Sequence, residues 1–319
     1  MLKNETEKYV TISVDLVLTT SILKRILKRM RYTIKDLQKQ FPNDDACLDA
    51  IFDMRYGDVD TCPKCGVVGT KFYRVTGRKC YACMHCGYQL HPLAQTIFHK
   101  SETPLTTWFY VMFQVSVAKN GMSAKEVARS TGVTYKTAHR MLKMVRSLML
   151  QGTDFLSGIV EVDETYVGGV RKKKYRDTKT QWENKTAVIG IVEKNGMART
   201  LVTKHADATV TIPFMKANIA PGSTVHTDES KIYSRVRRDF DHAFVNHSKF
   251  EYVKSGVTTN TIEGLWGNWK NSLRGTYHAV SPKYLQAYVN EFVFRYNYRG
   301  VAVYPVLLEL ASKRVAVET

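Results

Sequence analysis

The stretches GIVEVDETYVGG (residues 158–169) and TAVIGIVEKNGMARTLVTKHA (residues 186–206) decide the fold class of this chain. The first alternates apolar and polar side chains, a period of two that is typical of a strand with one buried face. The second contains two β-rich runs on either side of Asn195-Gly196, a dipeptide that favours a tight turn between antiparallel strands. Together they predict a strand followed by a hairpin.

A helix, a strand and a last helix are predicted after the hairpin. Pro213 is expected near the start of the first of these helices, which Pro221-Gly222 ends. Residues 223–230, STVHTDES, predict a short strand that finishes in an acidic turn. Residues 260–270, NTIEGLWGNWK, predict the last helix. This order of elements indicates a mixed α/β domain.

Composition restricts the class of protein. Of 319 residues, 44% are apolar, which is enough for one large core or two smaller ones. Forty-seven Lys and Arg against 29 Asp and Glu leave a net charge of +18, which favours a polyanionic partner, most commonly nucleic acid. The longest apolar run, Trp108 to Ala118, is too short to cross a membrane. Asp15 interrupts the apolar patch of the N-terminus, so we expect no signal peptide and a cytoplasmic protein.

Two Cys-x-x-Cys-Gly motifs, which begin at Cys62 and Cys83, predict a metal-stapled ribbon. Seventeen residues separate the second cysteine of one motif from the first cysteine of the other. Cys80 also lies three residues before Cys83, but only Cys65 and Cys86 are followed by the glycine that lets each knuckle turn back towards the sulfur atoms. Cys47 and Cys80 are expected to lie outside the site. The expected ligands of one structural Zn²⁺ are Cys62, Cys65, Cys83 and Cys86.

Residues 122–149, MSAKEVARSTGVTYKTAHRMLKMVRSLM, predict two helices joined by a turn. Ser123 is placed to cap the first helix, Thr131-Gly132-Val133 makes a tight turn, and Thr134 is placed to cap the second. Apolar residues recur at helical spacing in the second helix, at Ala138, Met141, Leu142 and Val145. The pattern is typical of a helix-turn-helix, whose second helix enters the major groove of DNA, although a purely structural pair is the alternative. The residues expected to contact DNA are Tyr135, Lys136, Thr137 and Arg140.

Three carboxylates from three predicted elements are candidates for a metal site. Asp163 is expected at the end of one strand, Asp228 at the end of another, and Glu263 near the start of the last helix. Such a set suits two divalent cations, Mg²⁺ or Mn²⁺, because hard oxygen ligands hold these ions without removing all their water. Structural explanations remain open: the two aspartates can be turn residues, and Asn260 with Glu263 has the spacing of a capping box.

Two further acids, Glu161 and Glu164, compete with Asp163 for this role. In a strand whose side chains alternate between faces, both are expected opposite Asp163, so that only a bulge would bring them into its site. The expected catalytic acids therefore remain Asp163, Asp228 and Glu263.

The last helix carries a basic residue on the same face as its acid. Glu263 and Lys270 would lie about 10 Å apart, nearly two helical turns, with Trp266 between them. Trp266 and Trp269 can either pack the helix on the sheet or stack on an unpaired base of DNA. We expect at least one of them to pack on the sheet.

Several motifs, in order along the chain, resemble the ISXO-like group of bacterial insertion-sequence transposases, which are relatives of the eukaryotic Merlin elements. The likeness covers Tyr32 to Leu310. The matching motifs are CPKCG…CMHCGYQ…TIFHKSETPLTTWF, VDETYVGG, HTDES, NTIEGLWGNWK and SLRGTYHAVSPKYLQAYVNEFVFRYNYR. The resemblance implies an RNase H-like core that cleaves DNA and joins it to target DNA by 3′-hydroxyl attack.

By this resemblance, Asp163, Asp228 and Glu263 match the acidic triad of the group, and Lys270 matches the lysine that follows the triad on the same helix. Two Mg²⁺ (or Mn²⁺) ions per active site are implied. Some members carry Asn in place of the third acid, so Glu263 favours an active enzyme. At least a dimer is expected, because two element ends must be joined.

The expected organisation is a helical region over residues 1–57, a zinc ribbon over 58–100, a helix-turn-helix region over 101–152 and an RNase H-like DDE domain over 153–312. The expected partner is double-stranded DNA, as element ends and as target, which would associate the protein with the nucleoid. The basic run after the first strand either contacts phosphates or is a solvated loop; its residues are Arg171, Lys172, Lys173 and Lys174. The competing functions are a transposase-derived regulator that no longer cleaves and a nuclease without strand transfer.

Overall fold

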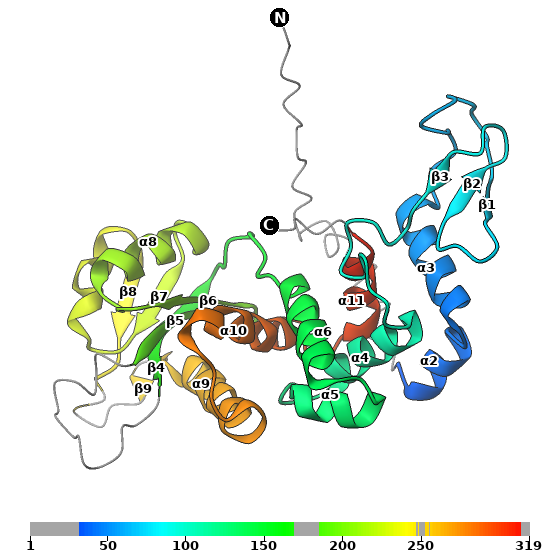
Figure 1. The fold of residues 1–319 in the computed structure, drawn as a ribbon. Helices are drawn as coiled ribbons and strands as arrows, with labels where there is room; N and C mark the ends of the chain where they lie inside the picture. Colours follow the sequence, from blue (N-terminus) through cyan, green and yellow to red (C-terminus); the bar gives the residue numbers. More distant parts are fainter. Residues whose placement is uncertain (1–31, 169–184, 247, 249–252, 255, 314–319) are drawn as a thin grey trace, which may run out of the picture. The chain divides into compact units, whose positions relative to one another are not determined.

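The computed structural model describes residues 32–168, 185–246, 248, 253–254 and 256–313, so the basic run at 171–174 lies outside the described residues (Figure 1). The chain divides into two compact units. The sheet unit contains residues 150–271 and 279–297, and the helical unit contains 32–149, 272–278 and 298–313. The helical unit thus takes segments from the end of the chain, a return that the expected linear order does not contain.

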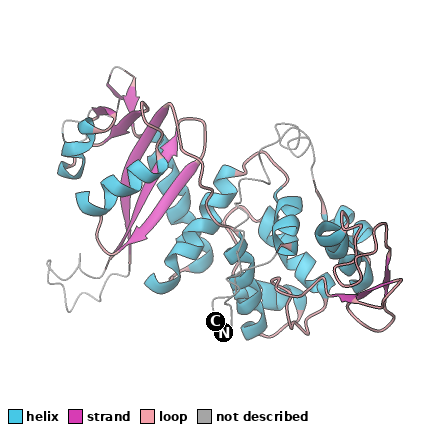
Figure 2. Cartoon of the chain, turned by 90° about the horizontal axis from the view of Figure 1, so that it is seen from above, coloured by secondary structure: helices cyan, strands magenta, loops and turns pink. Residues whose placement is uncertain are grey.

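The sheet unit is built on five strands in the order β6-β5-β4-β7-β8. Figure 2 draws the strands in magenta and the helices in cyan. The neighbours β4, β5 and β6 are antiparallel, whereas β7 and β8 run parallel to β4. This arrangement confirms the mixed α/β class and the predicted strand and hairpin. The bounds are β4 (Ile159–Val167), β5 (Thr186–Glu193), β6 (Ala198–Thr203), β7 (Thr224–Thr227) and β8 (Asp241–Phe244). A separate two-stranded pair is formed by β9 (Val253–Lys254) and β10 (Val257–Thr258).

Helices on both faces of the sheet bury its apolar side chains. On one face, α8 (Ala208–Asn218) and the 3₁₀ helix η3 (Lys231–Arg238) pack on β4 and β7. Val160 and Val162, two residues apart on β4, meet Met215, Tyr233 and Val236 there. The other face carries α9 (Asn260–Ser272). The expected period of two along β4 therefore assigns alternate residues to the two helical layers.

The prediction that Pro213 lies near a helix start is wrong. The side chain of Asp207 caps α8 by accepting hydrogen bonds from the backbone N–H groups of Thr209 and Val210, so the helix begins at Ala208. Pro213 is the sixth residue of the helix, where its ring removes one i→i−4 hydrogen bond. A strong acidic cap upstream outweighs the positional preference of proline.

The edge strand β6 is covered by side-chain amides. Gln286 and Asn297 of α10 (Pro282–Asn297) accept hydrogen bonds from the N–H groups of Val202 and Ala198, each at 2.7 Å. The side chain of Gln151 accepts a hydrogen bond of 2.6 Å from the N–H of Thr200, which lies between Ala198 and Val202 on β6. These bonds satisfy N–H groups that an exposed edge would offer to another strand.

The helical unit confirms the predicted helix pair. Ser123 and Thr134 cap α5 (Ala124–Thr131) and α6 (Tyr135–Leu148) with their side chains, and Gly132 between them has φ of 74°, a left-handed conformation that favours glycine. The apolar stripe predicted for the second helix is buried: Ala138, Met141, Leu142 and Val145. The other elements are α2 (Ile34–Gln40), α3 (Asp44–Tyr56), α4 (Leu105–Val117), the π-helix η5 (Leu273–Tyr277) and α11 (Val303–Ser312).

A three-stranded ribbon, β1 (Phe72–Arg74), β2 (Tyr81–Cys83) and β3 (Gln89–Leu90), packs on α3. The rings of Phe52 and Tyr81 stack with their centroids 3.8 Å apart. Arg74 forms ion pairs with Asp45 and Asp49, the latter at 3.1 Å.

No helix among the described residues is long and apolar enough to cross a membrane.

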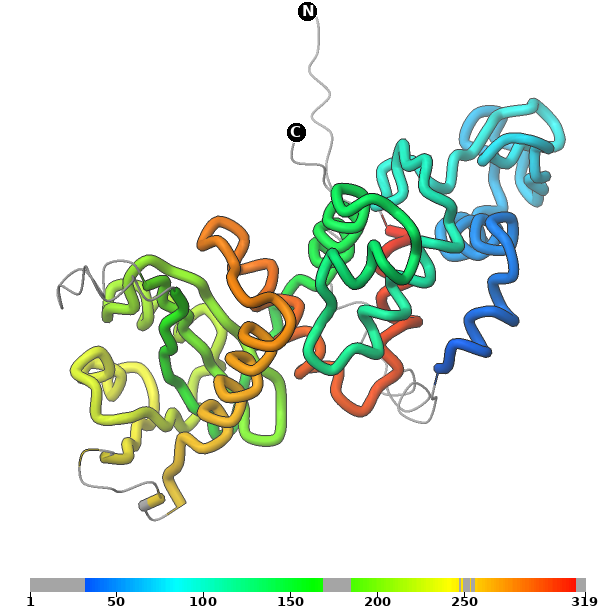
Figure 3. Tube along the Cα trace, turned by 60° about the horizontal axis from the view of Figure 1, so that its bottom comes forward, coloured from blue at the N-terminus to red at the C-terminus, as the bar shows by residue number. Residues whose placement is uncertain are grey.

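The closest approach of α9 to the sheet is made over Gly190 of β5. A Cβ atom on Gly190 would lie 2.4 Å from Cζ2 of Trp266, well inside van der Waals contact. Trp266 is 4% exposed and Trp269 is fully buried, with its ring centroid 5.5 Å from that of Phe292. Both tryptophans therefore pack α9 in place, as expected, rather than offering a face to a base. Figure 3 shows the Cα trace through this helix.

We predict that Gly190→Ala will destabilise the protein by about 1–3 kcal/mol, because the added methyl group overlaps a buried ring that has no room to move. Urea denaturation measures the change. Gly267→Ala in α9 is the matched control: its Cβ would meet no heavy atom within 4 Å, and a helical alanine should raise stability by up to about 1 kcal/mol. Equal stability of the Gly190 variant and the wild type would contradict the packing.

Candidate active site and metal centre

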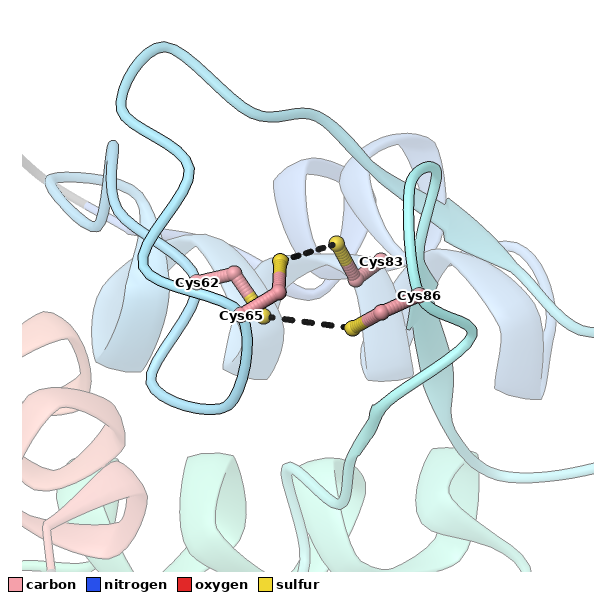
Figure 4. Close-up of side chains that lie close together, drawn as sticks. All are labelled: Cys62, Cys65, Cys83 and Cys86. Atoms are coloured by element: carbon pink, nitrogen blue, oxygen red, sulfur yellow. Dashed lines mark hydrogen bonds between the residues drawn. The ribbon is translucent and has the colours of Figure 1, made fainter.

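Four thiols of the ribbon converge on one point (Figure 4). The Sγ atoms of Cys62, Cys65, Cys83 and Cys86 all lie within 4.8 Å of one another. Cys62 and Cys86 are 3.7 Å apart, and Cys65 and Cys83 are 4.0 Å apart. A Zn–S distance of about 2.3 Å requires an edge of about 3.8 Å in a sulfur tetrahedron. The geometry therefore fits a structural zinc ion with no open coordination position.

The surroundings of Cys83 favour the thiolate form that a metal needs. The hydroxyl of Thr70 lies 3.3 Å from Cys83 Sγ and, with nearby backbone N–H groups, lowers the pKa of Cys83 to about 6. Gly66 and Gly87 have φ of 69° and 70°, which confirms the glycine turn predicted for each knuckle. Cys47 is buried in α3 and Cys80 donates to Gln89, so neither belongs to the cluster.

The pairing of β4 with β7 carries Asp163 and Asp228 towards the same end of β7. Every paired residue of β7 stands 65 positions after its partner in β4, from Ile159 with Thr224 to Glu161 with His226. The same 65 positions separate Asp163 from Asp228, each of which lies two residues beyond the last pair, and the charge of Asp228 contributes to the raised pKa of Asp163. Asp228 Oδ1 also accepts a hydrogen bond of 3.0 Å from the N–H of Ser230, which turns the chain into η3.

Asp163 does not end its strand, which corrects the expectation. β4 continues to Val167 because β5 pairs with it along nearly its whole length, through Val167 with Thr186. On its other side β4 pairs with β7 only from Ile159 through Glu161. Asp163 therefore lies in mid-strand, two residues beyond the last residue that pairs with β7, and is half-buried.

Glu263 reaches this region from the first turn of α9. Its carboxylate accepts a hydrogen bond of 2.7 Å from the hydroxyl of Thr259, and its side chain is exposed. The capping box considered for Asn260 and Glu263 does not form, because Asn260 is already the first helical residue. Lys270 lies seven residues further along the same helix, a spacing that puts it on the same helical face as Glu263. Its side chain is half-buried.

The carboxylates interact electrostatically. Burial, followed by the charges of Glu164, Asp228 and Glu263, raises the pKa of Asp163 to about 7. Within the described residues, the acids do not close to the 4.8 Å spacing of the four cysteines. A divalent ion held between these carboxylates would offset their negative charges.

Glu161 shares the face of Asp163, so the expectation that it lies opposite is wrong. The two residues are two positions apart and therefore point to the same side of the strand. The fully buried carboxylate of Glu161 accepts hydrogen bonds from Thr261 Oγ1 and from the N–H of Ile262, both at 2.9 Å. It thus binds the N-terminus of α9, where the helix dipole favours a negative charge.

Glu164 lies on the opposite face, as expected, and has a structural partner. The hydroxyl of Tyr233, on η3, donates to Glu164 Oε2 at 2.6 Å. Burial raises the pKa of Glu164, and the charge of Asp228 adds to the shift. This hydrogen bond joins the segment that follows Asp228 to the strand that carries Asp163.

The exposed face of α6 carries the residues expected to contact DNA. Tyr135, 54% exposed, Lys136 and Arg140 face solvent, and Thr137 is half-buried beside the cap residue Thr134, with the two hydroxyl oxygens 3.0 Å apart. The surface is therefore polar and basic and is separate from the buried stripe of the same helix.

The fold and the two sites define a protein with a cysteine ribbon and an α/β domain that gathers acidic side chains. Residues 155–297 match the ISXO2-like transposase domain, and residues 42–89 match the transposase zinc-ribbon domain. The chain belongs to this family of DDE transposases with a zinc ribbon, as the sequence motifs predicted.

A relative in Halobacterium salinarum, an uncharacterized protein in the transposable element ISH50, is 26% identical over 278 residues, which cover 81% of this chain and 92% of the relative. A solved structure of the simian T-cell lymphotropic virus intasome, in complex with PP2A regulatory subunit B56 gamma, contains a chain that is 9% identical with a TM-score of 0.28. That match covers 57% of this chain and 66% of the other, and its score is too low to carry an argument.

We predict that Cys83→Ser will lose about one equivalent of zinc per chain, because a hydroxyl cannot replace a thiolate in a closed four-sulfur site. Metal analysis of the purified protein measures the loss. Cys80→Ser is the matched control, since Cys80 lies in the same strand region but outside the cluster. Unchanged zinc content in the Cys83 variant would reject the ligand assignment.

Removal of the Glu161 carboxylate should loosen α9. We predict that Glu161→Ala will cost about 1–3 kcal/mol of stability, because the hydroxyl of Thr261 and the N–H of Ile262 lose their buried acceptor. Glu161→Gln keeps one oxygen acceptor and should cost less. Urea denaturation of the three proteins tests this order, and an alanine variant as stable as the wild type would show that the helix is held by other contacts.

Proposed function

We propose that the chain is the transposase of an insertion sequence, which cleaves DNA strands at the element ends and joins them to target DNA through 3′-hydroxyl attack. The observation that carries the proposal is the parallel pairing of β4 with β7, which stops two residues before Asp163 and Asp228, together with the effect of the Asp228 charge on the pKa of Asp163. Family membership supports the same reaction class. The acids proposed as catalytic are Asp163, Asp228 and Glu263.

The strand order supports an RNase H-like core for the sheet unit. Three antiparallel strands are followed by two that run parallel to the first. The acids then occupy the first strand, the end of the fourth strand and the helix that covers the same face as Asp163. A shared end of the sheet is the usual place for ligands in open α/β sheets.

The carboxylates would hold two divalent cations, Mg²⁺ or Mn²⁺. Burial and, after it, the charges of Glu164, Asp228 and Glu263 raise the pKa of Asp163, and a bound cation would offset both effects. When bound, the cations activate the attacking oxygen and stabilise the leaving oxygen of a phosphodiester. Asp163 and Asp228 would hold the ions from adjacent strands, and Glu263 from the helix. Lys270 would contact a phosphate of the bound strand, seven residues further along the same helix.

The helix pair α5 and α6 is proposed to act as a helix-turn-helix that recognises the element ends. Its two capped helices and its exposed basic face support this role. The contacts would be made by Tyr135, Lys136, Thr137 and Arg140. The zinc ion would stabilise the ribbon without taking part in chemistry, and two or more copies of the chain would be needed to join two ends.

Asp228→Asn is predicted to abolish strand cleavage and joining while leaving DNA binding nearly unchanged. Asparagine keeps the Oδ1 acceptor for the N–H of Ser230 but loses the charge that a cation needs. The loss should exceed about 100-fold, since even partners behind a metal ligand are worth about 10- to 100-fold. Purified protein, Mg²⁺ and the DNA that flanks its gene provide the assay, with nicked and joined strands as the readout.

The double variant Lys136→Ala/Arg140→Ala is the complementary control, because it should weaken end binding and leave the metal site intact. Binding without cleavage by the wild type would favour a transposase-derived regulator. Cleavage without joined products would favour a nuclease. Loss of both binding and cleavage in Asp228→Asn would count against the role given to this aspartate.

A further inference from the structure

A cleft of about 340 Å³ lies between α8 and η3 in the sheet unit. Its floor is made by apolar residues of α8, among them Ile212 and Pro213. Its rim is charged and is formed by Lys216, Arg235, Arg238 and Asp239. The cleft therefore combines an uncharged floor with a rim that carries three basic groups and one acidic group, a net charge of +2.

The 3₁₀ geometry of η3 places the two arginines on one stripe. With three residues per turn, Arg235 and Arg238 stand directly above each other, about 6 Å apart along the axis. Tyr233 and Val236 form a second stripe and are 1% exposed, so they anchor η3 on the sheet. The remaining stripe, with Lys231 and Arg237, faces away from the cleft, and Arg237 lies over the ring of Phe244.

The two arginines have no partner of opposite charge. Lys216 pairs with Asp239 at 2.7 Å, which neutralises the one acid of the rim. In the part of the chain that the structure describes, neither Arg235 nor Arg238 forms an ion pair or a hydrogen bond. Both are exposed. Two unpaired guanidinium groups, held on one stripe of an anchored helix, are suited to bind an anion with repeated charges.

We propose that this cleft binds the sugar-phosphate backbone of duplex DNA, as a sequence-independent contact on the face of the sheet opposite to Asp163. The inference rests on the proposed function. A duplex presents one phosphate per about 3.4 Å of axis on each strand, so the 6 Å stripe of two arginines can engage one strand at two points. Because η3 leads from the end of β7 back to the start of the parallel strand β8, the stripe would hold a part of the duplex away from the acids.

The contact also answers an electrostatic need. Three carboxylates repel a polyanion, and cations at the acids act only on the phosphate that is cleaved. Unpaired arginines on the opposite face of the sheet would hold other phosphates of the duplex without adding positive charge among the acids. The apolar floor, formed in part by Ala208 and Pro213, leaves the charged rim to make the contact.

The test compares two double variants that remove the same charge from the same helix. Arg235→Gln/Arg238→Gln alters the cleft stripe, and Lys231→Gln/Arg237→Gln alters the outer stripe. Binding to a duplex of unrelated sequence is measured by fluorescence anisotropy over a range of salt concentrations, with no added divalent cation. The cleft variant should bind roughly tenfold more weakly, and its slope of log K against log salt should fall by about 2. The outer variant should change little.

A gain-of-binding variant makes the test independent of folding. Asp239→Asn releases Lys216 from its ion pair, so it should tighten binding and raise the salt slope by about 1. Equal losses in the two double variants, or no gain for Asp239→Asn, would overturn the cleft assignment. Displacement of DNA by inorganic phosphate at matched ionic strength would also overturn it in favour of a small phosphate ligand. A wild-type protein that binds no duplex would instead refute the proposed function.

Discussion

The packing of Trp266 over Gly190 sets how closely α9 approaches the sheet, and the acidic site depends on this distance. Glu161 fixes the other coordinate, because its buried carboxylate binds the N-terminus of the same helix. One contact controls the separation of helix and sheet, and the other controls where the helix begins. Glu263 stands one residue beyond the N–H that Glu161 binds, so both contacts together position its carboxylate relative to Asp163.

Local chemistry explains what could be predicted from the sequence. The two cysteine knuckles, the caps of α5 and α6 and the turn at Asn195, with φ of 63°, each depend on residues within a few positions of one another. The three acids were also proposed from the sequence, where their residues left a structural role open and the family resemblance favoured the catalytic one. The separation of 65 residues between Asp163 and Asp228 acquires its meaning only once β7 is known to pair with β4.

The wrong predictions concern residues whose position is set by strand pairing or by contacts with distant parts of the chain. Asp163 was expected at a strand end, yet β5 holds β4 extended for four more residues. Glu161 was assigned to the wrong face, although a period of two places it with Asp163, and its role depends on a helix a hundred residues later. Pro213 was placed near a helix start because proline favours the first turn of a helix. The cap at Asp207 outweighs that preference and starts the helix at Ala208. The strand β8, half-exposed and four residues long, has no strong pattern of its own.

The two faces of the sheet divide the electrostatic work of a protein that must bring a polyanion to an acidic site. The face under α9 carries Glu161 and Asp163, and burial, followed by neighbouring negative charges, raises the pKa of Asp163. The face under α8 and η3 is an apolar core whose rim is basic. In the proposed reaction, a lysine among the acids would compete with the cations they are proposed to hold, so attraction for DNA would come from elsewhere on the surface. The arginine stripe on η3 meets this condition. Tyr233, which anchors η3, donates a hydrogen bond to Glu164 of β4, so the guanidinium groups are held at a fixed place relative to the acids without contacting them.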